Sequence, residues 1–159
     1  MHPLVALAVA AATLATPAAA APALTDAHIR AFLAQQEKAW NTAALPAYFS
    51  AFEPKATFTD QYRTPAGKLV PYGTSTLAQA RAQTTKFRAR SKVAETHRIV
   101  RITLSPDGRS AQVLAYVTSQ ITTGATRRTT CAERRQELVL AGGRVRSQGV
   151  TDTFVRCGR

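Results

Sequence analysis

Three short glycine-containing segments, SPDGR, TTGAT and AGGR, divide the C-terminal part of this chain into four apolar and β-branched runs. The runs cover roughly residues 94–105, 110–122, 128–140 and 144–157. Glycine adopts the positive φ that a tight hairpin turn requires, and strands of this length pair readily when such turns join them. The pattern therefore predicts an antiparallel meander of four strands.

The residues before the meander show helical spacing. Thr25 is a good N-cap, and Asp26 suits the positive end of a helix dipole. Apolar and amide side chains then recur at helical intervals at Ile29, Phe32, Leu33, Gln36 and Trp40. This spacing predicts an amphipathic helix over residues 26–41.

Shorter elements follow this helix. A second helix carries Leu45, Tyr48, Phe49 and Phe52 on one side and ends before Pro54, with Pro46 in its first turn. A short strand over residues 56–60 and a Pro- and Gly-containing loop over residues 61–74 come next. Ser75 is expected to cap a third helix over residues 76–90.

Helices followed by a meander predict an α+β domain in which the helices cover one face of the sheet. When each hairpin is taken as symmetric about its turn, one face is richer in large apolar residues, and we expect it to meet the helices. That face carries Val100, Ile102, Leu104, Leu114, Tyr116, Ala132, Leu138, Val150 and Phe154. The opposite face carries His97, Ile99, Arg101, Val113, Val117, Glu133, Arg135 and Glu137. A slip of one residue in any hairpin would reverse that strand.

The first 21 residues differ from the rest. An apolar run from Leu4 to Thr16, too short to span a bilayer, precedes the small-residue segment PAAAAP. This pattern predicts a cleaved secretory signal peptide over residues 1–21, a domain over residues 22–159 and a periplasmic or secreted location without a transmembrane segment. A retained N-terminal anchor is the alternative, because the segment before the apolar run contains no Lys or Arg.

The two cysteines, Cys131 and Cys157, fit export. An even count in an exported chain indicates a disulfide, here closing a loop of about 26 residues and contributing on the order of 3 kcal/mol. Two unpaired buried thiols are the alternative.

The chain is strongly basic, with a formal net charge of +12. This charge favours polyanions and anionic surfaces through a long-range attraction that salt weakens. The basic residues are scattered along the sequence, however, so a solvated basic surface also accounts for them. No nucleic-acid-binding motif, metal-ligand spacing or cofactor fingerprint is present, so we expect no metal, no cofactor and no specific nucleic acid.

The order of elements, together with Trp40-Asn41, Tyr48-Phe49 and the segment EPKATFTD, resembles the NTF2-like superfamily, in its SnoaL-like and ketosteroid-isomerase-like branch. The chain departs from the common pattern at Thr42-Ala43-Ala44, where many relatives have a Gly-Asp pair. The resemblance implies a cone-shaped fold with three N-terminal helices on a curved antiparallel sheet and a pocket at the wide end. Members often form homodimers through the convex face, so a homodimer is among the implied partners.

The same resemblance directs attention to Asp60. The corresponding carboxylate of ketosteroid isomerases shuttles a proton, which an Asp beside an apolar cavity can do. Those enzymes also use two hydrogen-bond donors, whose places here fall near Gln36 and near Arg134 or Arg135. Neither donor is retained. A strand-end residue that caps a turn is the structural alternative for Asp60.

The leading hypothesis is therefore an exported domain that binds a small, partly apolar ligand without catalysis. A polar floor made by Arg134 and Asp152 would suit an anionic or carbonyl head. The expected cavity residues are Trp40, Tyr48, Phe58, Tyr62, Tyr116, Arg134 and Asp152. One alternative is an isomerase, cyclase or hydrolase with Asp60 as general base. Another is a basic interaction module for an acidic envelope component or partner protein.

Overall fold

The computed structural model describes residues 23–158, so the predicted signal peptide over residues 1–21 lies outside the described residues. In chain order the elements are α1 (Asp26–Asn41), α2 (Leu45–Ser50), β1 (Phe52–Arg63), β2 (Leu69–Thr76), α3 (Leu77–Arg88), β3 (Ser91–Leu104), β4 (Ser110–Thr123), β5 (Thr126–Ala141) and β6 (Arg144–Val155). Within the described part of the chain, none of the helices combines the length and apolar character that crossing a bilayer requires.

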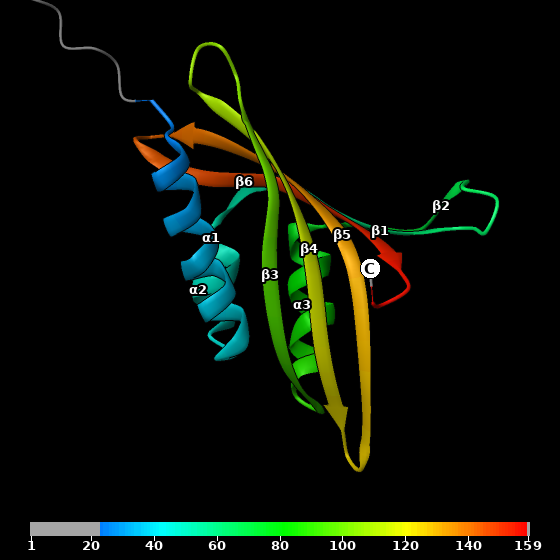
Figure 1. The fold of residues 1–159 in the computed structure, drawn as a ribbon. Helices are drawn as coiled ribbons and strands as arrows, with labels where there is room; N and C mark the ends of the chain where they lie inside the picture. The colour runs from blue at the N-terminus through cyan, green and yellow to red at the C-terminus, as the bar shows by residue number, and fades with distance from the viewer. Residues whose placement is uncertain (1–22, 159) are drawn as a thin grey trace, which may run out of the picture.

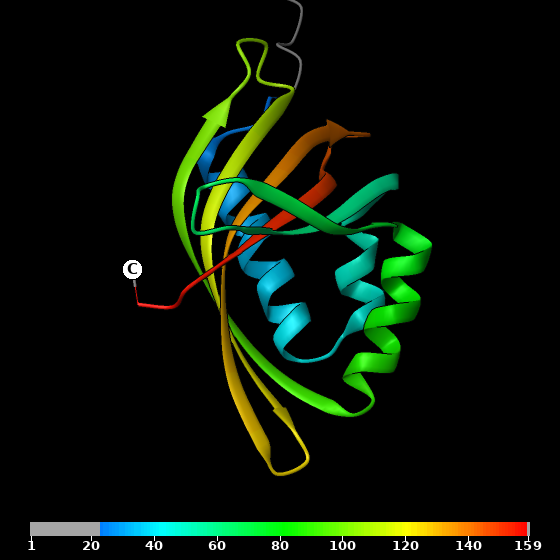
Figure 2. The ribbon, with the colours of Figure 1, turned by 90° about the vertical axis from the view of Figure 1, so that its right-hand side faces the viewer.

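The strands form one sheet in the order β2-β1-β6-β5-β4-β3. Strands β3 to β6 pair antiparallel in sequence order, so the predicted meander is confirmed. Strand β1 extends the sheet by pairing parallel to β6 and antiparallel to β2. The sheet bends strongly, and the three helices lie on its concave side (Figures 1 and 2). The α+β architecture with helices on one face is thus as predicted.

Residues 61–74 are not a simple loop, because β1 continues to Arg63 and residues 69–76 form β2. Pro71 and Gly73 suggested a loop, but β2 is an edge strand and needs hydrogen-bond partners on one side only. Figure 1 shows the β1–β2 hairpin projecting away from the helices.

The boundaries of two helices also differ from the prediction. Helix α2 ends at Ser50, and Phe52 already belongs to β1. The N-cap of α3 is Thr76 rather than Ser75. The Thr76 hydroxyl accepts from the backbone of Gln79, and the Gln79 side chain accepts from the Thr76 backbone, which completes a capping box.

The hairpin glycines behave as predicted. Gly108, Gly124, Gly142 and Gly143 have φ values of 64°, 57°, 56° and 74°, a region that other residues rarely adopt. The predicted disulfide is also present: it joins Cys131 of β5 to Cys157, with the two Cα atoms 5.2 Å apart.

The predicted faces are wrong for β4 and for the part of β3 before Arg101, whereas Ile102 lies on the helix side as predicted. Val113 and Val117 are buried against the helices, whereas Val100 is 54% exposed. Tyr116 pairs with Arg98 and Glu133 on the convex face. The pairing register shifts between Ile99 and Arg101, which places both Ile99 and Ile102 against the core. Hairpin symmetry could not foresee this bulge. The β4 pairing is also offset by one residue from the symmetric one, since Leu104 pairs with Ala111 and Tyr116 with Glu133, and such an offset reverses a strand.

The predicted faces of β5 and β6 are correct. Ala132, Leu138 and Val150 are buried on the helix side. Glu133 and Arg135 lie on the convex side, where Glu133 approaches Arg63 of β1.

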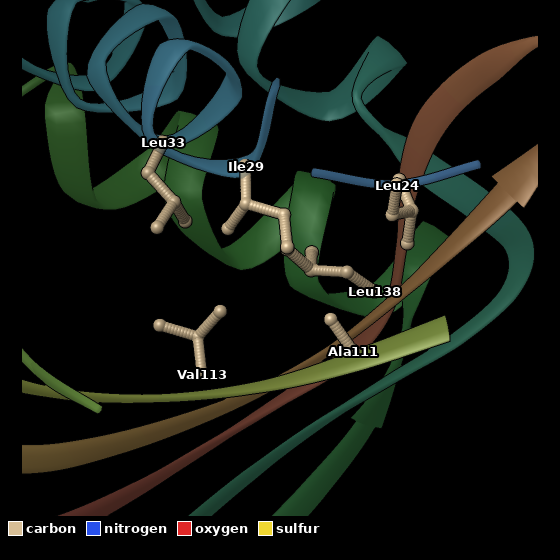
Figure 3. Close-up of a cluster of buried hydrophobic side chains, with 6 residues drawn as sticks. All are labelled: Leu24, Ile29, Leu33, Ala111, Val113 and Leu138. Atoms are coloured by element: carbon tan, nitrogen blue, oxygen red, sulfur yellow. The ribbon is translucent and has the colours of Figure 1, made fainter. Parts of the chain in front are cut away.

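An aliphatic core fills one end of the concave face. Its buried members are Leu24, Ile29, Leu33, Ala111, Val113 and Leu138 (Figure 3). Helix α1 contributes Ile29 and Leu33, whose spacing of four residues places them on one side of the helix. This core holds α1 against the sheet and so positions the C-terminal end of α1 at the other end of the concave face.

Candidate functional site

A second apolar cluster lies beside the aliphatic core and is mainly aromatic. Its buried residues are Tyr48, Phe49, Phe52, Ala56, Ala80 and Val150, with Trp40 and Phe58 packed against them. The rings meet at tilted or edge-on angles; Trp40 and Tyr48, for example, have centroids 4.9 Å apart. Rigid rings in such arrangements do not fill the curved interior completely.

The unfilled space is a cavity of about 290 Å³ between helices α2 and α3 and the bent sheet. Its lining residues are Trp40, Tyr48, Phe49, Phe58, Thr59, Asp60, Ser75, Ala80, Gln83, Thr84, Phe87, Val93, Glu95, Val117, Ser119, Ile121, Thr130, Ala132, Arg134, Val150, Asp152 and Phe154. The volume falls near the lower end of the range of roughly 300–1,000 Å³ seen for small-molecule sites. Apolar side chains form most of the wall, and a few polar groups converge on it.

Five of the seven residues expected at the cavity line it: Trp40, Tyr48, Phe58, Arg134 and Asp152. Asp60 lines it as well.

Two of the expected residues do not line the cavity. Tyr62 lies two residues beyond Asp60 on β1 and is 43% exposed beside Tyr72. Tyr116 is on the convex face, where the Arg98 guanidinium lies 5.5 Å from its ring centroid.

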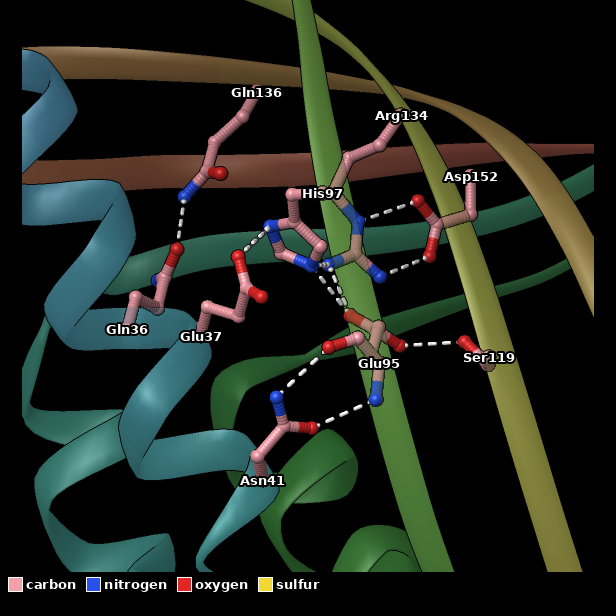
Figure 4. A network of polar contacts seen from close by, with 9 residues as sticks. All are labelled: Gln36, Glu37, Asn41, Glu95, His97, Ser119, Arg134, Gln136 and Asp152. Carbon is pink, nitrogen blue, oxygen red and sulfur yellow. Dashed lines mark hydrogen bonds and ion pairs between the residues drawn. The ribbon is translucent and has the colours of Figure 1, made fainter.

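Arg134 is the centre of the polar floor. Its Nε and Nη2 atoms donate to the two carboxylate oxygens of Asp152 at 2.8 and 2.7 Å, which is a bidentate pair across β5 and β6. Its Nη1 donates to Glu95 Oε1 on β3 at 2.9 Å. Only 13% of the Arg134 side chain is exposed. One guanidinium therefore satisfies two carboxylates from two different strands (Figure 4).

The Glu95 carboxylate forms further hydrogen bonds. His97 Nε2 lies 2.7 Å from Glu95 Oε1, and the Ser119 hydroxyl donates to Oε2 at 2.7 Å. His97 Nδ1 lies 3.9 Å from the carboxylate of Glu37 on α1. His97 thus stands between two carboxylates from different elements, as Figure 4 shows.

The electrostatic consequence is clearest at Glu95. Burial alone would raise the pKa of its carboxyl, but Arg134, His97 and Ser119 together lower this pKa to about 2. Burial likewise acts to lower the pKa of Arg134, and Asp152 and Glu95 reverse the effect and raise it. Both groups therefore stay charged across the ordinary pH range.

Asn41 anchors the end of α1 to this cluster. Its Nδ2 donates to the Glu95 carbonyl oxygen at 2.8 Å, and its Oδ1 accepts from the Glu95 amide at 2.7 Å. Deeper in the fold, Gln136 of β5 donates to Gln36 of α1 at 2.9 Å. Asn41 at the end of the first helix thus fixes the register of that helix against β3.

Asp60 lines the cavity and is exposed to solvent, which places it at the cavity mouth. Its carboxylate has no ion-pair or hydrogen-bond partner among residues 23–158. Burial raises the pKa of Asp60, and the neighbouring Asp152 raises it further, while Arg134 acts in the opposite direction. Asp152 is its partner in the parallel pairing of β1 and β6. Tyr72 of β2 precedes Gly73, the residue that pairs with Asp60 in the β1–β2 ladder, and burial and then the charge of Asp60 raise the pKa of its phenol.

Tyr48 supplies the cavity with a hydroxyl group from α2. Its side chain is buried, and burial raises the pKa of the phenol above its ordinary range, with smaller effects from Arg134, Glu95 and Asp152. The hydroxyl therefore stays protonated and can donate a hydrogen bond. Within the described residues no hydrogen bond occupies it.

The charges that line the cavity do not suit the anionic head expected from the sequence. Among residues 23–158, Arg134 is the one cationic side chain in the lining, and Glu95 and Asp152 already neutralise it. Asp60 adds a further negative charge when it is ionised.

Glu95, His97 and Ser119 were absent from the residues expected at the site. Val93, Glu95, His97 and Ile99 alternate along β3, and this period of two was the available signal. His97 was assigned to the convex face because apolar content alone chose the face of β3.

No protein-family model matches the chain, and no curated protein matches its sequence. Solved structures do match its fold. A ketosteroid isomerase-like protein from Erwinia carotovora atroseptica is 11% identical, with 82% of this chain and 95% of that chain covered and a TM-score of 0.62. The β subunit of a putative aromatic-ring-hydroxylating dioxygenase from Novosphingobium aromaticivorans is 16% identical. The match covers 83% of this chain and 90% of that chain, with a TM-score of 0.66. An NTF-2 like protein of unknown function from Shewanella oneidensis is 15% identical. The match covers 80% of this chain and 97% of that chain, with a TM-score of 0.56.

Proposed function

Because the chain has the NTF2-like fold, we propose that it binds a small, partly apolar molecule in the concave cavity. The observation that carries the proposal is the cavity itself, about 290 Å³ with aromatic walls and converging polar groups. Small-molecule sites combine an apolar lining with a few fixed polar groups in this way. The proposed contact residues are Trp40, Tyr48, Phe58, Asp60, Arg134 and Asp152.

The walls and the floor have separate roles in this proposal. Apolar contact with the rings supplies most of the affinity, since about 25 cal/mol is gained per Å² of apolar surface removed from water. The Tyr48 hydroxyl and the Asp60 carboxylate orient the ligand, because both lack a partner within the described residues. Arg134 and Asp152 satisfy one another and keep the floor rigid.

The test is a fluorescence titration with three naphthalene probes that share one ring system: 2-naphthylmethylamine, 2-naphthalenemethanol and 2-naphthoate. At least one probe should bind with a saturable signal. The substitution Ala132→Leu places a larger side chain in the cavity and should weaken that binding. Glu133→Leu alters the next residue, which lies on the convex face, and serves as the matched control. The absence of saturable binding for all three probes would overturn the proposal.

The cellular location is part of the proposal. The disulfide between Cys131 and Cys157 supports a site of action outside the reducing cytosol, since such bonds persist mainly in oxidising compartments. Export through the N-terminal segment is tested by N-terminal sequencing of the protein recovered from its producing cells, which should begin near residue 21 or 22. A mature chain that begins at Met1 would contradict export by cleavage.

A second candidate function, catalysis with Asp60 as general base, is favoured by one observation. Asp60 faces the cavity with a raised pKa, which suits a carboxylate that accepts and returns a proton. In this candidate Asp60 removes a proton from a carbon next to a ligand carbonyl, and the Tyr48 hydroxyl donates to the carbonyl oxygen. The proton, or a deuteron from the solvent, then returns to the same carbon, or to the γ-carbon when the ligand has a β,γ double bond, so no other reactant is needed.

This candidate is tested with 2-tetralone in D₂O. Nuclear magnetic resonance should show that the protein accelerates deuterium exchange at the carbons beside the carbonyl. Asp60→Asn should abolish the acceleration, while Tyr48→Phe should reduce it, with both variants still folded. Exchange at the rate of buffer alone would exclude this base chemistry for 2-tetralone and leave the binding proposal standing.

A further inference from the structure

The cavity contains more negative than positive groups, although the whole chain is strongly basic. Its charged lining residues are Asp60, Glu95, Asp152 and Arg134. Arg134 forms ion pairs of 2.9 Å with Glu95 and 2.7 Å with Asp152, so its single positive charge is shared between two carboxylates. Asp60 forms no ion pair within the described residues, and of these four side chains it is the exposed one, so an entering molecule meets it first.

The aromatic wall has a matching property. The face of an aromatic ring attracts cations that come within about 6 Å of its centroid. Two rings of this cluster already contact cations in this way. The guanidinium of Arg81 lies 5.6 Å from the centroid of Phe49, and that of Arg88 lies 5.4 Å from the centroid of Trp40. The rings of Tyr48, Phe58, Phe87 and Phe154 also line the cavity.

We propose that the cavity is selective for a cationic ligand, namely a protonated amine carried on a small apolar body. The ammonium group would pair with Asp60 at the mouth, and the apolar body would occupy the space between the rings. This inference rests on the proposed binding function and specifies the chemical class of the ligand. It differs from the expectation of an anionic head because Arg134 is already neutralised.

The groups that face Asp60 come from several elements. They are Asp152 on β6, Arg134 on β5 and Tyr72 on β2. Asp152 opposes ionisation of Asp60 and Arg134 favours it, and Tyr72 stays a neutral phenol. A bound ammonium group would add a positive charge and favour ionisation of Asp60. Amine affinity should therefore rise with pH through the titration of Asp60 and then remain constant until the amine itself loses its proton.

The basic surface does not cancel this local preference. Exposed charges that are more than about 8–10 Å apart are largely screened at physiological ionic strength, whereas two charges in direct contact are screened less. Arg81 and Arg88 are cations outside the lining that lie close to rings of the aromatic cluster. Added salt should consequently weaken repulsion between the amine and the basic surface more than it weakens the contact with Asp60.

The three naphthalene probes test the inference, because they differ mainly in the charge of the head group. At pH 7.5 we expect 2-naphthylmethylamine to bind more tightly than 2-naphthalenemethanol, with 2-naphthoate weakest. The affinities of the amine and the carboxylate should differ by about tenfold or more. Asp60→Asn should weaken amine binding by about fivefold to tenfold and should weaken binding of the uncharged alcohol by a clearly smaller factor.

Glu133→Gln, which removes a carboxylate from the convex face, is the matched control and should change neither affinity. Equal or tighter binding of 2-naphthoate, or amine binding that Asp60→Asn leaves unchanged, would overturn the charge selectivity. In those cases binding of the alcohol would still support the proposed function. Failure of all three probes to bind would overturn the proposed function and the selectivity with it.

Discussion

Val113 and Val117 lie four residues apart on the same face of β4, and both are almost fully buried, yet they have different surroundings. Val113 belongs to the aliphatic core, where side chains of α1 and the sheet fill the space. Val117 lines the cavity beneath the aromatic cluster. One strand therefore passes from a filled region to a hollow region.

The difference comes from the shapes of the side chains and from the curvature of the sheet. Branched aliphatic side chains such as Ile29, Leu33 and Leu138 interdigitate to the density of a protein interior. Rings such as Trp40 and Tyr48 pack at fixed angles and leave a gap where the sheet bends away from α2 and α3. The stability of the filled region thus depends on how completely side chains occupy its volume. The stability of the hollow region depends on the pairing of its buried charges. The predictions below test this contrast with three sets of variants, from the largest expected effect to the smallest.

Arg134→Leu should cause the largest loss of stability. Glu95 and Asp152 would lose their shared counter-charge, and removing one partner from a buried ion pair costs about 3–5 kcal/mol. The measurement is denaturant unfolding at pH 7. Arg135→Leu is the matched control, because Arg135 is exposed on the convex face. Similar losses for the two variants would contradict the importance of charge pairing in the hollow region.

The same variant has an expected pH dependence. Arg134, His97 and Ser119 hold the pKa of Glu95 at about 2 in the folded state, below its ordinary value of 4.5. Glu95 therefore stabilises the wild-type protein above pH 4.5, and this contribution is lost as the pH falls towards 2. The difference in stability between the wild type and Arg134→Leu should narrow over that range.

Val113→Ala and Val117→Ala form the second test, since they make the same change on one face of one strand. Val113→Ala should cost about 2–3 kcal/mol, because it removes two carbons and leaves a void among packed neighbours. Val117→Ala should cost about 1 kcal/mol less, because its methyl groups already border an open space and lose fewer contacts. Denaturant unfolding of both variants gives the comparison. An equal or larger cost at Val117 would show that the two regions are equally well packed.

Asp60→Asn should have the smallest effect on stability and the opposite sign. The folded state raises the pKa of Asp60 above its ordinary value of 3.8, so the folded protein favours the protonated carboxyl. Wild-type stability consequently falls as the pH rises above 3.8, and the neutral Asn avoids this loss. The expected gain at pH 7 is at most about 0.5 kcal/mol, since Asp60 is exposed at the mouth, and it should disappear near pH 3. Thermal unfolding at both pH values measures it, and a destabilised variant at pH 7 would contradict the unpaired state of Asp60.

Much of the fold could be predicted from local patterns. The helix from Asp26 to Asn41 follows from apolar spacing and the Thr25 cap, and the hairpins follow from glycines such as Gly108 and Gly124. The edge strand β2 was missed because Pro71 and Gly73 indicate a loop unless the position of the strand in the sheet is known.

The candidate site was predictable in part. Trp40, Tyr48 and Phe58 were expected at the cavity because large rings dominate that part of the chain, and they line it. Tyr116 was placed on the wrong face because it pairs with Glu133 rather than with Ala132, an offset of one residue from the symmetric β4–β5 hairpin. Glu95 and His97 were missed because their partners come from α1, β4 and β5 as well as from β3 itself.

The amino-acid sequence by itself determined where helices, hairpins and the disulfide-forming cysteines occur, because caps, turns and apolar periodicity act over a few residues. Only the tertiary structure decided which side chains share the cavity and which carboxylates share Arg134. Those relations depend on the register and curvature of a six-stranded sheet, and a shift of one residue exchanges its two faces.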